Sequence, residues 1–229
     1  MHPRNSRVPD EISGLATVRP SYWLRAKRQL AAADPTMAAI IARHPRVVLA
    51  SRGDPFVTLA RSIVGQQISV KAAESVWTRV VSCCVTIEPA TVMAQPAGAL
   101  RACGLSERKV EYVRDLAAHF ESGRVDPSRF DVQSDEDIIT ELVDIRGIGR
   151  WTAEMFLIFN LLRPNVLPLD DLGLLKAVGL HYFKGAKAER LMRAAGRKRV
   201  VKLARNWEPW RSVATWYLWR SLDPVPVEY

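Results

Sequence analysis

The chain has 229 residues, of which 48% are hydrophobic and 25% charged, and its 33 lysines and arginines exceed its 24 aspartates and glutamates by a formal charge of +9. This length allows one large domain or two small ones that share a core. The proportions of hydrophobic and charged residues are typical of a soluble globular protein. A basic excess favours a polyanionic partner, most commonly nucleic acid, although a basic surface that is merely solvated has the same composition.

The cysteines and the apolar runs exclude several classes of protein. Cys83, Cys84 and Cys103 form no C-x-x-C pattern, so we expect buried, reduced side chains and neither a zinc nor an iron–sulfur site. Residues 1–13 lack the apolar core of a signal peptide. The longest apolar run, residues 155–162, is too short to span a bilayer. We therefore expect a soluble protein without metal, cofactor or membrane contact. We also expect a monomer. Its location would be cytoplasmic and nucleoid-associated in a prokaryote, or nuclear in a eukaryote.

Helical spacing dominates the chain and no convincing alternating strand pattern is present, so the predicted fold class is all-α. Residues 23–44 have a helical pattern. Asp54-Pro55 combines an N-cap with a first-turn proline, and Gly65 is expected to end the helix that follows. The apolar stripe of that helix is Phe56, Leu59, Ala60, Ile63 and Val64.

Serine N-caps predict the next three helices. Ser69 precedes one apolar stripe and Ser106 precedes another. Ser134 with Asp137 resembles a capping box ahead of a third.

The C-terminal part of the chain is less regular. Helices are predicted over residues 171–178 and 211–220, and residues 163–165 are predicted as a loop. Residues 179–196 are basic and poorly periodic, so we expect a loop with a short helix there.

A tight turn with two glycines separates two predicted helices. Ile145 is expected to end the first, and Gly147 and Gly149 to adopt backbone conformations closed to residues with side chains. The N–H groups that begin the second helix have no internal partner and can bind a phosphate oxygen. An ordinary helix–glycine–helix corner is the alternative. The side chains available to reinforce a phosphate contact are Arg146, Arg150 and Thr152.

Four motifs in the chain point to one family. Ile145-Arg-Gly-Ile-Gly-Arg-Trp-Thr-Ala153 and Val166-Leu-Pro-Leu-Asp-Asp-Leu-Gly-Leu174 resemble the hairpin and the Gly/Pro-rich loop with its aspartate in the helix–hairpin–helix superfamily of DNA glycosylases. Phe56 followed by Arg61-Ser-Ile-Val-Gly-Gln-Gln-Ile-Ser-Val70, and Trp207-Glu-Pro-Trp-Arg-Ser-Val-Ala214, resemble its 3-methyladenine DNA glycosylase II (alkylated-base) family.

The resemblance implies two helical lobes that flank a cleft. The middle lobe would comprise residues 54–162 and contain the helix–hairpin–helix at residues 138–160. The second lobe would be built from both chain ends, residues 1–53 and 163–229. Long members of the family carry an N-terminal α/β domain, and too few residues precede Asp54 for one here, so we expect none.

The resemblance also implies that Asp171 is the catalytic aspartate and leaves Asp170 as the helix cap, with the reverse assignment as the alternative. Breaking the bond between base and deoxyribose places positive charge on the sugar, which a nearby carboxylate stabilises. The carboxylate can also orient or deprotonate the attacking water. An alkylated purine is already cationic and leaves as a neutral base, so one acid suffices.

Trp151 stands where the strand-cleaving branches of the superfamily have a Schiff-base lysine, so the resemblance implies no lyase activity. Trp151 and Met155 share a helix face, and a tryptophan on such a face more often packs in the core. The resemblance implies instead that Trp151 and Trp219, with Met155 beside Trp151, line the pocket for the extruded base. Aromatic faces attract cations by about 0.5–2 kcal/mol, which favours methylated purines over normal bases.

The resemblance places Gln67 at the wedge that fills the gap left by the extruded nucleotide. The family usually has an apolar residue at this position. An ordinary polar loop residue is the alternative.

We therefore expect a monofunctional DNA glycosylase that excises alkylated purines, such as 3-methyladenine and 7-methylguanine, from double-stranded DNA and leaves an abasic site in base excision repair. The alternatives are a glycosylase for another lesion, such as ethenoadenine or hypoxanthine, and a non-catalytic helix–hairpin–helix DNA-binding module. Asp171 favours the enzymes, because a pure DNA-binding module has no need of a carboxylate that faces phosphates.

Overall fold

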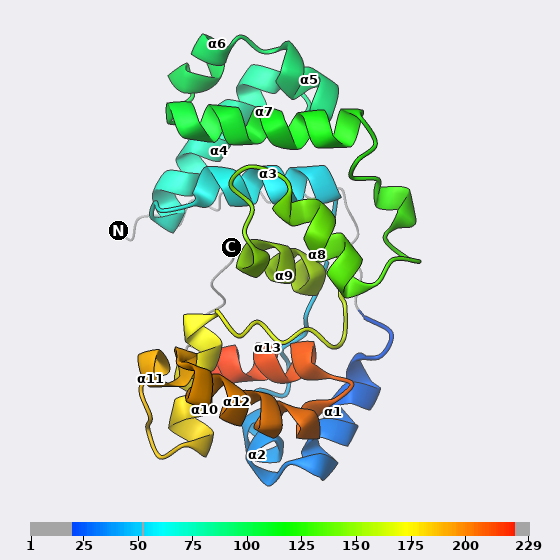
Figure 1. The fold of residues 1–229 in the computed structure, drawn as a ribbon, viewed down its shortest axis with the longest axis vertical. Helices are drawn as coiled ribbons and strands as arrows, with labels where there is room; N and C mark the ends of the chain where they lie inside the picture. Colours follow the sequence, from blue (N-terminus) through cyan, green and yellow to red (C-terminus); the bar gives the residue numbers. More distant parts are fainter. Residues whose placement is uncertain (1–19, 52, 223–229) are drawn as a thin grey trace, which may run out of the picture.

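The computed structural model describes residues 20–51 and 53–222, and every regular element in these ranges is helical, which confirms the all-α fold class (Figure 1). In the same ranges, no helix is both long and apolar enough to cross a membrane. The three cysteines are free thiols; Cys84 and Cys103 are buried and Cys83 is half-buried.

The N-terminal helical segment is two helices rather than one. They are α1 (Trp23–Ala33) and α2 (Pro35–Arg43). Pro35 disfavours the helical conformation of the residue before it, so the first helix cannot run on through Asp34. The Asp34 carboxylate then begins the second helix, because it accepts hydrogen bonds from the backbone N–H groups of Thr36 and Met37.

The middle of the chain forms a run of helices that begin where the capping residues predict. They are α3 (Pro55–Gly65), α4 (Val70–Cys84), α5 (Pro89–Ala94), α6 (Ala97–Ala102), α7 (Glu107–Glu121), α8 (Asp135–Val143) and α9 (Arg150–Phe159), with a 3-10 turn at Pro127–Arg129. Asp54, Ser69, Ser106 and Ser134 each accept a hydrogen bond from the backbone N–H three residues on, which confirms all four N-caps. The capping box is incomplete, because the Asp137 carboxylate accepts from the Ser134 hydroxyl and not from its backbone.

The C-terminal part contains more helix than its sequence pattern predicts. Its elements are α10 (Leu172–Tyr182), α11 (Ala188–Met192), α12 (Ala194–Ala204), a 3-10 turn at Arg205–Trp207, and α13 (Arg211–Leu222). The prediction of a loop with one short helix over residues 179–196 is wrong at both ends, where α10 and α12 extend into it. The apolar pattern of α12 is weak in the sequence, because its buried face has only three residues, Gly196, Val200 and Ala204, and none of them has a large apolar side chain.

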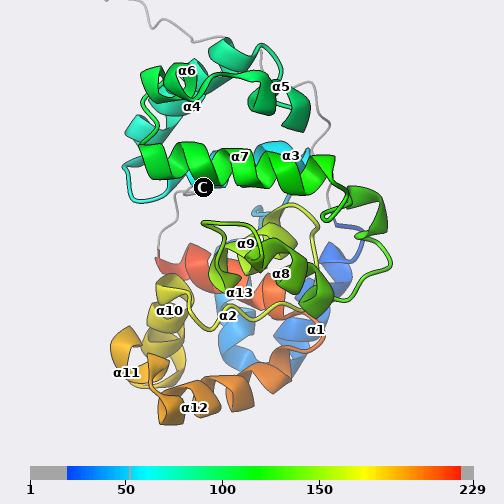
Figure 2. The same cartoon turned by 45° about the horizontal axis from the view of Figure 1, so that its top comes forward.

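The helices pack in two sets (Figures 1 and 2). In one set α3 packs on α4, α7 and α9, α5 and α6 pack on α7, and α8 packs on α9. In the other, α13 packs on α1, α2 and α10, and α11 packs between α10 and α12. Buried apolar side chains form one cluster that runs through both sets. The predicted domain boundaries and the cleft between lobes stay predictions.

Asp34 connects three segments of the second set. Its Oδ1 atom caps α2, and its Oδ2 atom accepts hydrogen bonds from the Tyr182 hydroxyl at 2.8 Å and from Trp207 Nε1 at 3.0 Å. Asp34 and Trp207 are buried, and the Tyr182 and Trp207 rings pack at a centroid distance of 5.7 Å. The N-terminal helices are therefore joined to the C-terminal ones through one carboxylate.

We expect Asp34→Ala to lower the free energy of unfolding by about 3 kcal/mol or more, because four donors lose their acceptor at a buried site. Urea denaturation followed by circular dichroism measures this loss. Asp54→Ala is the matched control, since Asp54 also caps a helix ahead of a proline but is exposed, and it should cost only about 1 kcal/mol. Equal losses in the two variants would contradict the role given to Asp34.

Candidate functional site

The turn between α8 and α9 contains two glycines with different roles. Gly147 has a φ of +85°, and a Cβ added to it would lie 2.2 Å from the Tyr112 ring. Only glycine fits there. Gly149 has a φ of −95° and open space where a Cβ would be, so the prediction that its backbone is closed to side chains is wrong.

Gly149 instead leaves the start of α9 without a side-chain cap. The first N–H groups of this helix therefore lack an acceptor from the described side chains, and the helix dipole adds partial positive charge at the same end. This is the arrangement that binds a phosphate oxygen. The binding of a DNA phosphate by the hairpin stays a prediction.

Two side chains missed by the sequence analysis hold the hairpin in place. Gln66 Nε2 donates to the Gly147 carbonyl at 2.8 Å, and the Arg146 backbone N–H donates to Asp115 Oδ2 at 2.8 Å. Gln66 ends α3 and Asp115 lies on α7, so both helices position the turn. Gln66 stands beside Gln67 in the quoted motif, but nothing in the local spacing shows which partner it reaches.

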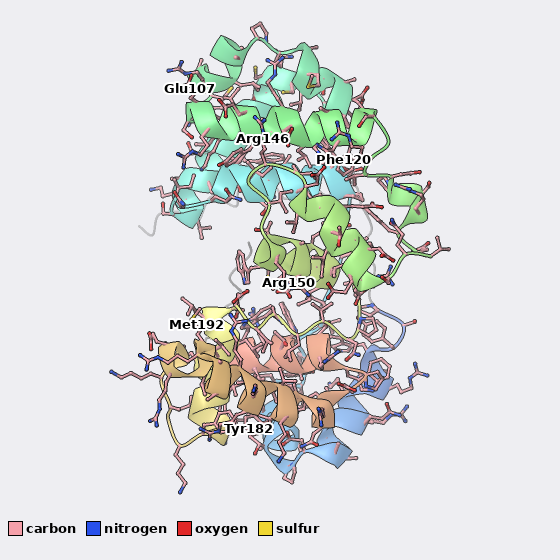
Figure 3. The ribbon with its side chains drawn as sticks, in the orientation of Figure 1. Glu107, Phe120, Arg146, Arg150, Tyr182 and Met192 are labelled. Atoms are coloured by element: carbon pink, nitrogen blue, oxygen red, sulfur yellow. The ribbon has the colours of Figure 1, made fainter. Side chains whose placement is uncertain are left out.

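The three side chains predicted to reinforce a phosphate contact are in different environments. Arg146 lies exposed on the turn, and its guanidinium makes no hydrogen bond or ion pair with the described residues (Figure 3). The Arg150 guanidinium is bound to Glu136 at 2.5 Å and to Glu154 at 3.2 Å. Thr152 is buried in the first turn of α9. Arg146 is thus the one of these side chains that is ready to meet a phosphate without rearrangement.

Glu154 is a buried carboxyl behind Arg150. Its Oε1 atom accepts from Arg150 Nε, whereas Oε2 is buried without a hydrogen-bond partner among the described residues. Burial raises the pKa of Glu154 to about 7, against the lowering effect of Arg150.

Asp171 is the N-cap of α10 and the centre of a converging set of donors. Its Oδ1 atom accepts from the Leu174 backbone N–H at 2.5 Å and from Trp219 Nε1 at 2.8 Å, and its Oδ2 atom accepts from Trp151 Nε1 at 3.0 Å. The side chain is 9% exposed. The prediction that Asp170 is the cap is wrong, because Asp170 instead forms an ion pair with Arg197 of α12.

The two predicted pocket tryptophans meet at this carboxylate. Trp151 comes from α9 and is 37% exposed, and Trp219 comes from α13 and stacks on Phe159 at 5.6 Å. A Cβ on Gly173 would lie 3.1 Å from both Trp219 and Asp171 Oδ1, closer than ordinary contact, so a side chain at this position would push on both groups. Met155 lies one turn after Trp151, partly buried against the core.

Gln67 is exposed in the loop between α3 and α4 and has a φ of +60°, an uncommon conformation for a residue with a side chain. Through its neighbour Gln66 this loop touches the hairpin. Ile68, an apolar residue that is 40% exposed, follows it. The loop therefore presents both a polar and an apolar side chain beside the hairpin.

Comparisons with known proteins agree on one family. Residues 60–202 match the family described as HhH-GPD superfamily base excision DNA repair protein. DNA-3-methyladenine glycosylase 1 of Schizosaccharomyces pombe is 34% identical over 73% of the chain and 72% of that protein, and the putative DNA-3-methyladenine glycosylase YfjP of Bacillus subtilis is 30% identical over 82% and 66%. The chain thus spans about two thirds of the length of the second relative.

Solved structures show the same fold. The DNA-3-methyladenine glycosidase of Bacillus halodurans superposes with a TM-score of 0.77 at 33% identity, over 86% of this chain and 89% of that one. The S. pombe 3-methyladenine DNA glycosylase in complex with abasic DNA gives 0.68 at 28% identity, over 86% and 96%.

Gly147→Ala is expected to lower the free energy of unfolding by about 2 kcal/mol or more, because it combines a positive φ with a clash against Tyr112. Gly149→Ala, on the same turn, should cost less than about 1 kcal/mol, since an alanine fits its conformation and space. Thermal or urea denaturation compares the two. A larger loss for Gly149→Ala would contradict the geometry of the turn.

Glu154 should make stability fall as pH rises. Its raised pKa means that the folded protein binds the proton more tightly, so the free energy of unfolding decreases between pH 4.5 and about 7, by up to about 3 kcal/mol, and is then constant. Glu154→Gln lacks this titration and should gain stability relative to the parent across that window in urea denaturation at several pH values.

Glu136→Gln is the matched control, because it removes the other carboxylate on Arg150 from an exposed site. Hydrogen bonding to Arg150 lowers the pKa of Glu136, so its contribution is lost only as pH falls below the window. The same pH-dependent gain in both variants would show that burial of Glu154 is not the cause.

Proposed function

Because the chain belongs to the HhH-GPD superfamily of base excision DNA repair proteins, we propose that it is a DNA glycosylase that excises alkylated purines, such as 3-methyladenine and 7-methylguanine, from double-stranded DNA. The relatives named above as DNA-3-methyladenine glycosylases support the alkylated base as substrate. The observation that carries the proposal is the Asp171 carboxylate, buried at the start of a helix and held by two tryptophans.

The hydrogen bonds orient this carboxylate for reaction. A carboxylate has about four acceptor positions, two on each oxygen. Leu174 and Trp219 occupy both positions of Oδ1, whereas Trp151 occupies one position of Oδ2. The acceptor position that is left lies on Oδ2, beside the exposed indole of Trp151. We assign this position to the sugar cation or to the water that attacks it.

The charge of the carboxylate matches the reaction. Loss of the base leaves positive charge on the deoxyribose, and a fixed negative charge in a poorly hydrated site stabilises it more than water does. An alkylated purine departs as a neutral molecule, so no second acid is needed to protonate it. Water then adds to the sugar cation, loses a proton to the Asp171 carboxylate, and leaves an abasic site.

The tryptophans favour a cationic base. Trp151 exposes more of its ring than a core residue does, and Trp219 is backed by Phe159. A methylated purine over an indole face gains about 0.5–2 kcal/mol from its positive charge. Excision of another lesion, such as ethenoadenine or hypoxanthine, would lack this term, and a non-catalytic module would not use Asp171.

We further propose that the enzyme does not cleave the DNA strand. Trp151 occupies the position at which the resembling lyases have a lysine, and its indole N–H points at Asp171. An indole cannot form a Schiff base with the sugar. Gln67 and its neighbour Ile68 are the candidates for the wedge that holds the duplex open.

We expect Asp171→Asn to reduce release of methylated bases by at least about a hundredfold, because it removes the charge that stabilises the transition state. Asparagine still caps a helix, so the fold and DNA affinity should persist. Incubation with methylated DNA, followed by chromatography of the released bases, measures the rate, and gel analysis of the product without alkali tests strand integrity.

Asp170→Asn is the matched control, an adjacent aspartate whose partner is Arg197, and it should stay close to the parent rate. If Asp171→Asn released methylated bases at the parent rate, the mechanism would be wrong. Strand cleavage that accompanies base release in the parent would overturn the monofunctional assignment alone.

A further inference from the structure

Almost all of the net charge of the protein lies in one segment. Residues 184–205 contain nine lysines and arginines and one glutamate, whereas the remainder of the chain contains 24 basic and 23 acidic residues. The part of the chain that carries the hairpin, Asp171 and the tryptophans is therefore close to neutral. Any long-range attraction to a polyanion must come mainly from this segment.

The cations of this segment are exposed. They follow one another along the chain from just after α10 through α11 and α12 to the turn after α12, elements that Figures 1 and 2 show together, and we call their exposed members the basic surface. Its residues are Lys184, Lys187, Arg190, Arg193, Lys198, Arg199, Lys202 and Arg205. Glu189 is the one acidic residue within the segment.

The basic surface is not neutralised by the described part of the protein. Arg199 lies over the Phe183 ring at 4.3 Å, and the other seven side chains make no hydrogen bond or ion pair with the described residues. The hairpin differs, because Glu136 and Glu154 bind the Arg150 guanidinium. An external anion therefore meets eight exposed cations on the basic surface, whereas the hairpin offers one free guanidinium, that of Arg146, beside the paired guanidinium of Arg150.

The spacing of the cations on α12 does not stabilise the helix. Lys198 and Lys202 are four residues apart, and Lys202 and Arg205 three apart, so like charges face each other on one side. With Arg197 and Val201 these residues line a hollow of about 350 Å³. Such an arrangement is unfavourable by itself and becomes favourable when an anion lies between the cations.

The basic surface begins beside the catalytic loop. Arg197, in the first turn of α12, forms an ion pair with Asp170, the residue before Asp171. Gly196 lets α12 approach α11 closely, because a Cβ there would lie 2.5 Å from the Arg190 carbonyl oxygen. From this end α12 runs for about 16 Å, at 1.5 Å per residue. The first turn of α12 is thus tied to the residue that precedes Asp171, and the cations of the basic surface on α12 follow along the same helix.

We propose that the basic surface is a second DNA-binding surface, which binds backbone phosphates of the duplex beside the damaged nucleotide and supplies most of the non-specific affinity. The proposal rests on the proposed function in taking duplex DNA as the partner. The hairpin then fixes the position of the strand with few charges, and the basic surface provides the salt-dependent attraction that lets the enzyme hold undamaged DNA while it searches.

The test is the affinity of the protein for an undamaged duplex, measured by fluorescence anisotropy across about 0.05 to 0.2 M salt. The variant combines Lys198→Gln, Lys202→Gln and Arg205→Gln, which are exposed positions where glutamine keeps the helix. Loss of three phosphate contacts should reduce the slope of log affinity against log salt by between about 2 and 3, and weaken binding at least about tenfold at physiological salt.

The matched control combines Arg28→Gln, Arg46→Gln and Arg101→Gln, exposed and unpaired positions elsewhere that remove the same charge. Its slope should stay near that of the parent protein. If both triple variants lose the same DNA affinity and the same salt dependence, the effect depends only on the net charge of the protein, and the proposal is wrong. Parent-like DNA affinity in the basic-surface variant, with lost binding to acidic phospholipid vesicles, would assign the surface to a membrane instead.

Binding to undamaged DNA separates this proposal from the proposed function. If the parent protein releases methylated bases but the basic-surface variant shows the same salt dependence of DNA binding as the parent, the proposed function stands and the second DNA-binding surface is wrong. If the parent binds DNA through the basic surface but releases no base, the second surface stands and the proposed function is wrong.

Discussion

The position of the Asp171 carboxylate is the constraint on which the rest of the structure depends. Its donors come from three helices, through Trp151 on α9, Trp219 on α13 and the backbone of Leu174 on α10. A carboxylate that is 9% exposed is tolerated only while such donors are in place. The hairpin helix and the two C-terminal helices therefore cannot shift independently, and the start of α9 keeps a fixed position relative to Asp171.

The same constraint explains how charge is distributed. A reaction that needs a carboxylate next to a polyanion is helped when neighbouring acids are neutralised. Glu136 and Glu154 are bound to Arg150, and Asp170 is bound to Arg197. Three acids near Asp171 are thus paired with arginines, and the net positive charge of the chain lies in residues 184–205. In the function that we propose, recognition of the lesion and attraction to DNA are thus assigned to different parts of the molecule.

Much of the fold was predictable because its signals are local. An N-cap and the N–H that it binds are three residues apart, so Ser69, Ser106 and Ser134 could be identified from spacing alone. The break at Asp34 was missed, although Pro35 signals it, because the apolar pattern continues across it. Helix α12 was missed because its buried face is made of small residues.

The sequence by itself determined the helical class, the caps, the family motifs and the sign of the net charge, since each depends on composition or on neighbours within a turn or two. Only the tertiary structure decided which tryptophans donate to Asp171, which carboxylates bind the Arg150 guanidinium and where the free cations lie. The bonds to Asp171 join residues 20 and 48 positions apart, and the bond from Arg150 to Glu136 spans 14. Such partners meet because helices pack, and no spacing in the chain records the packing.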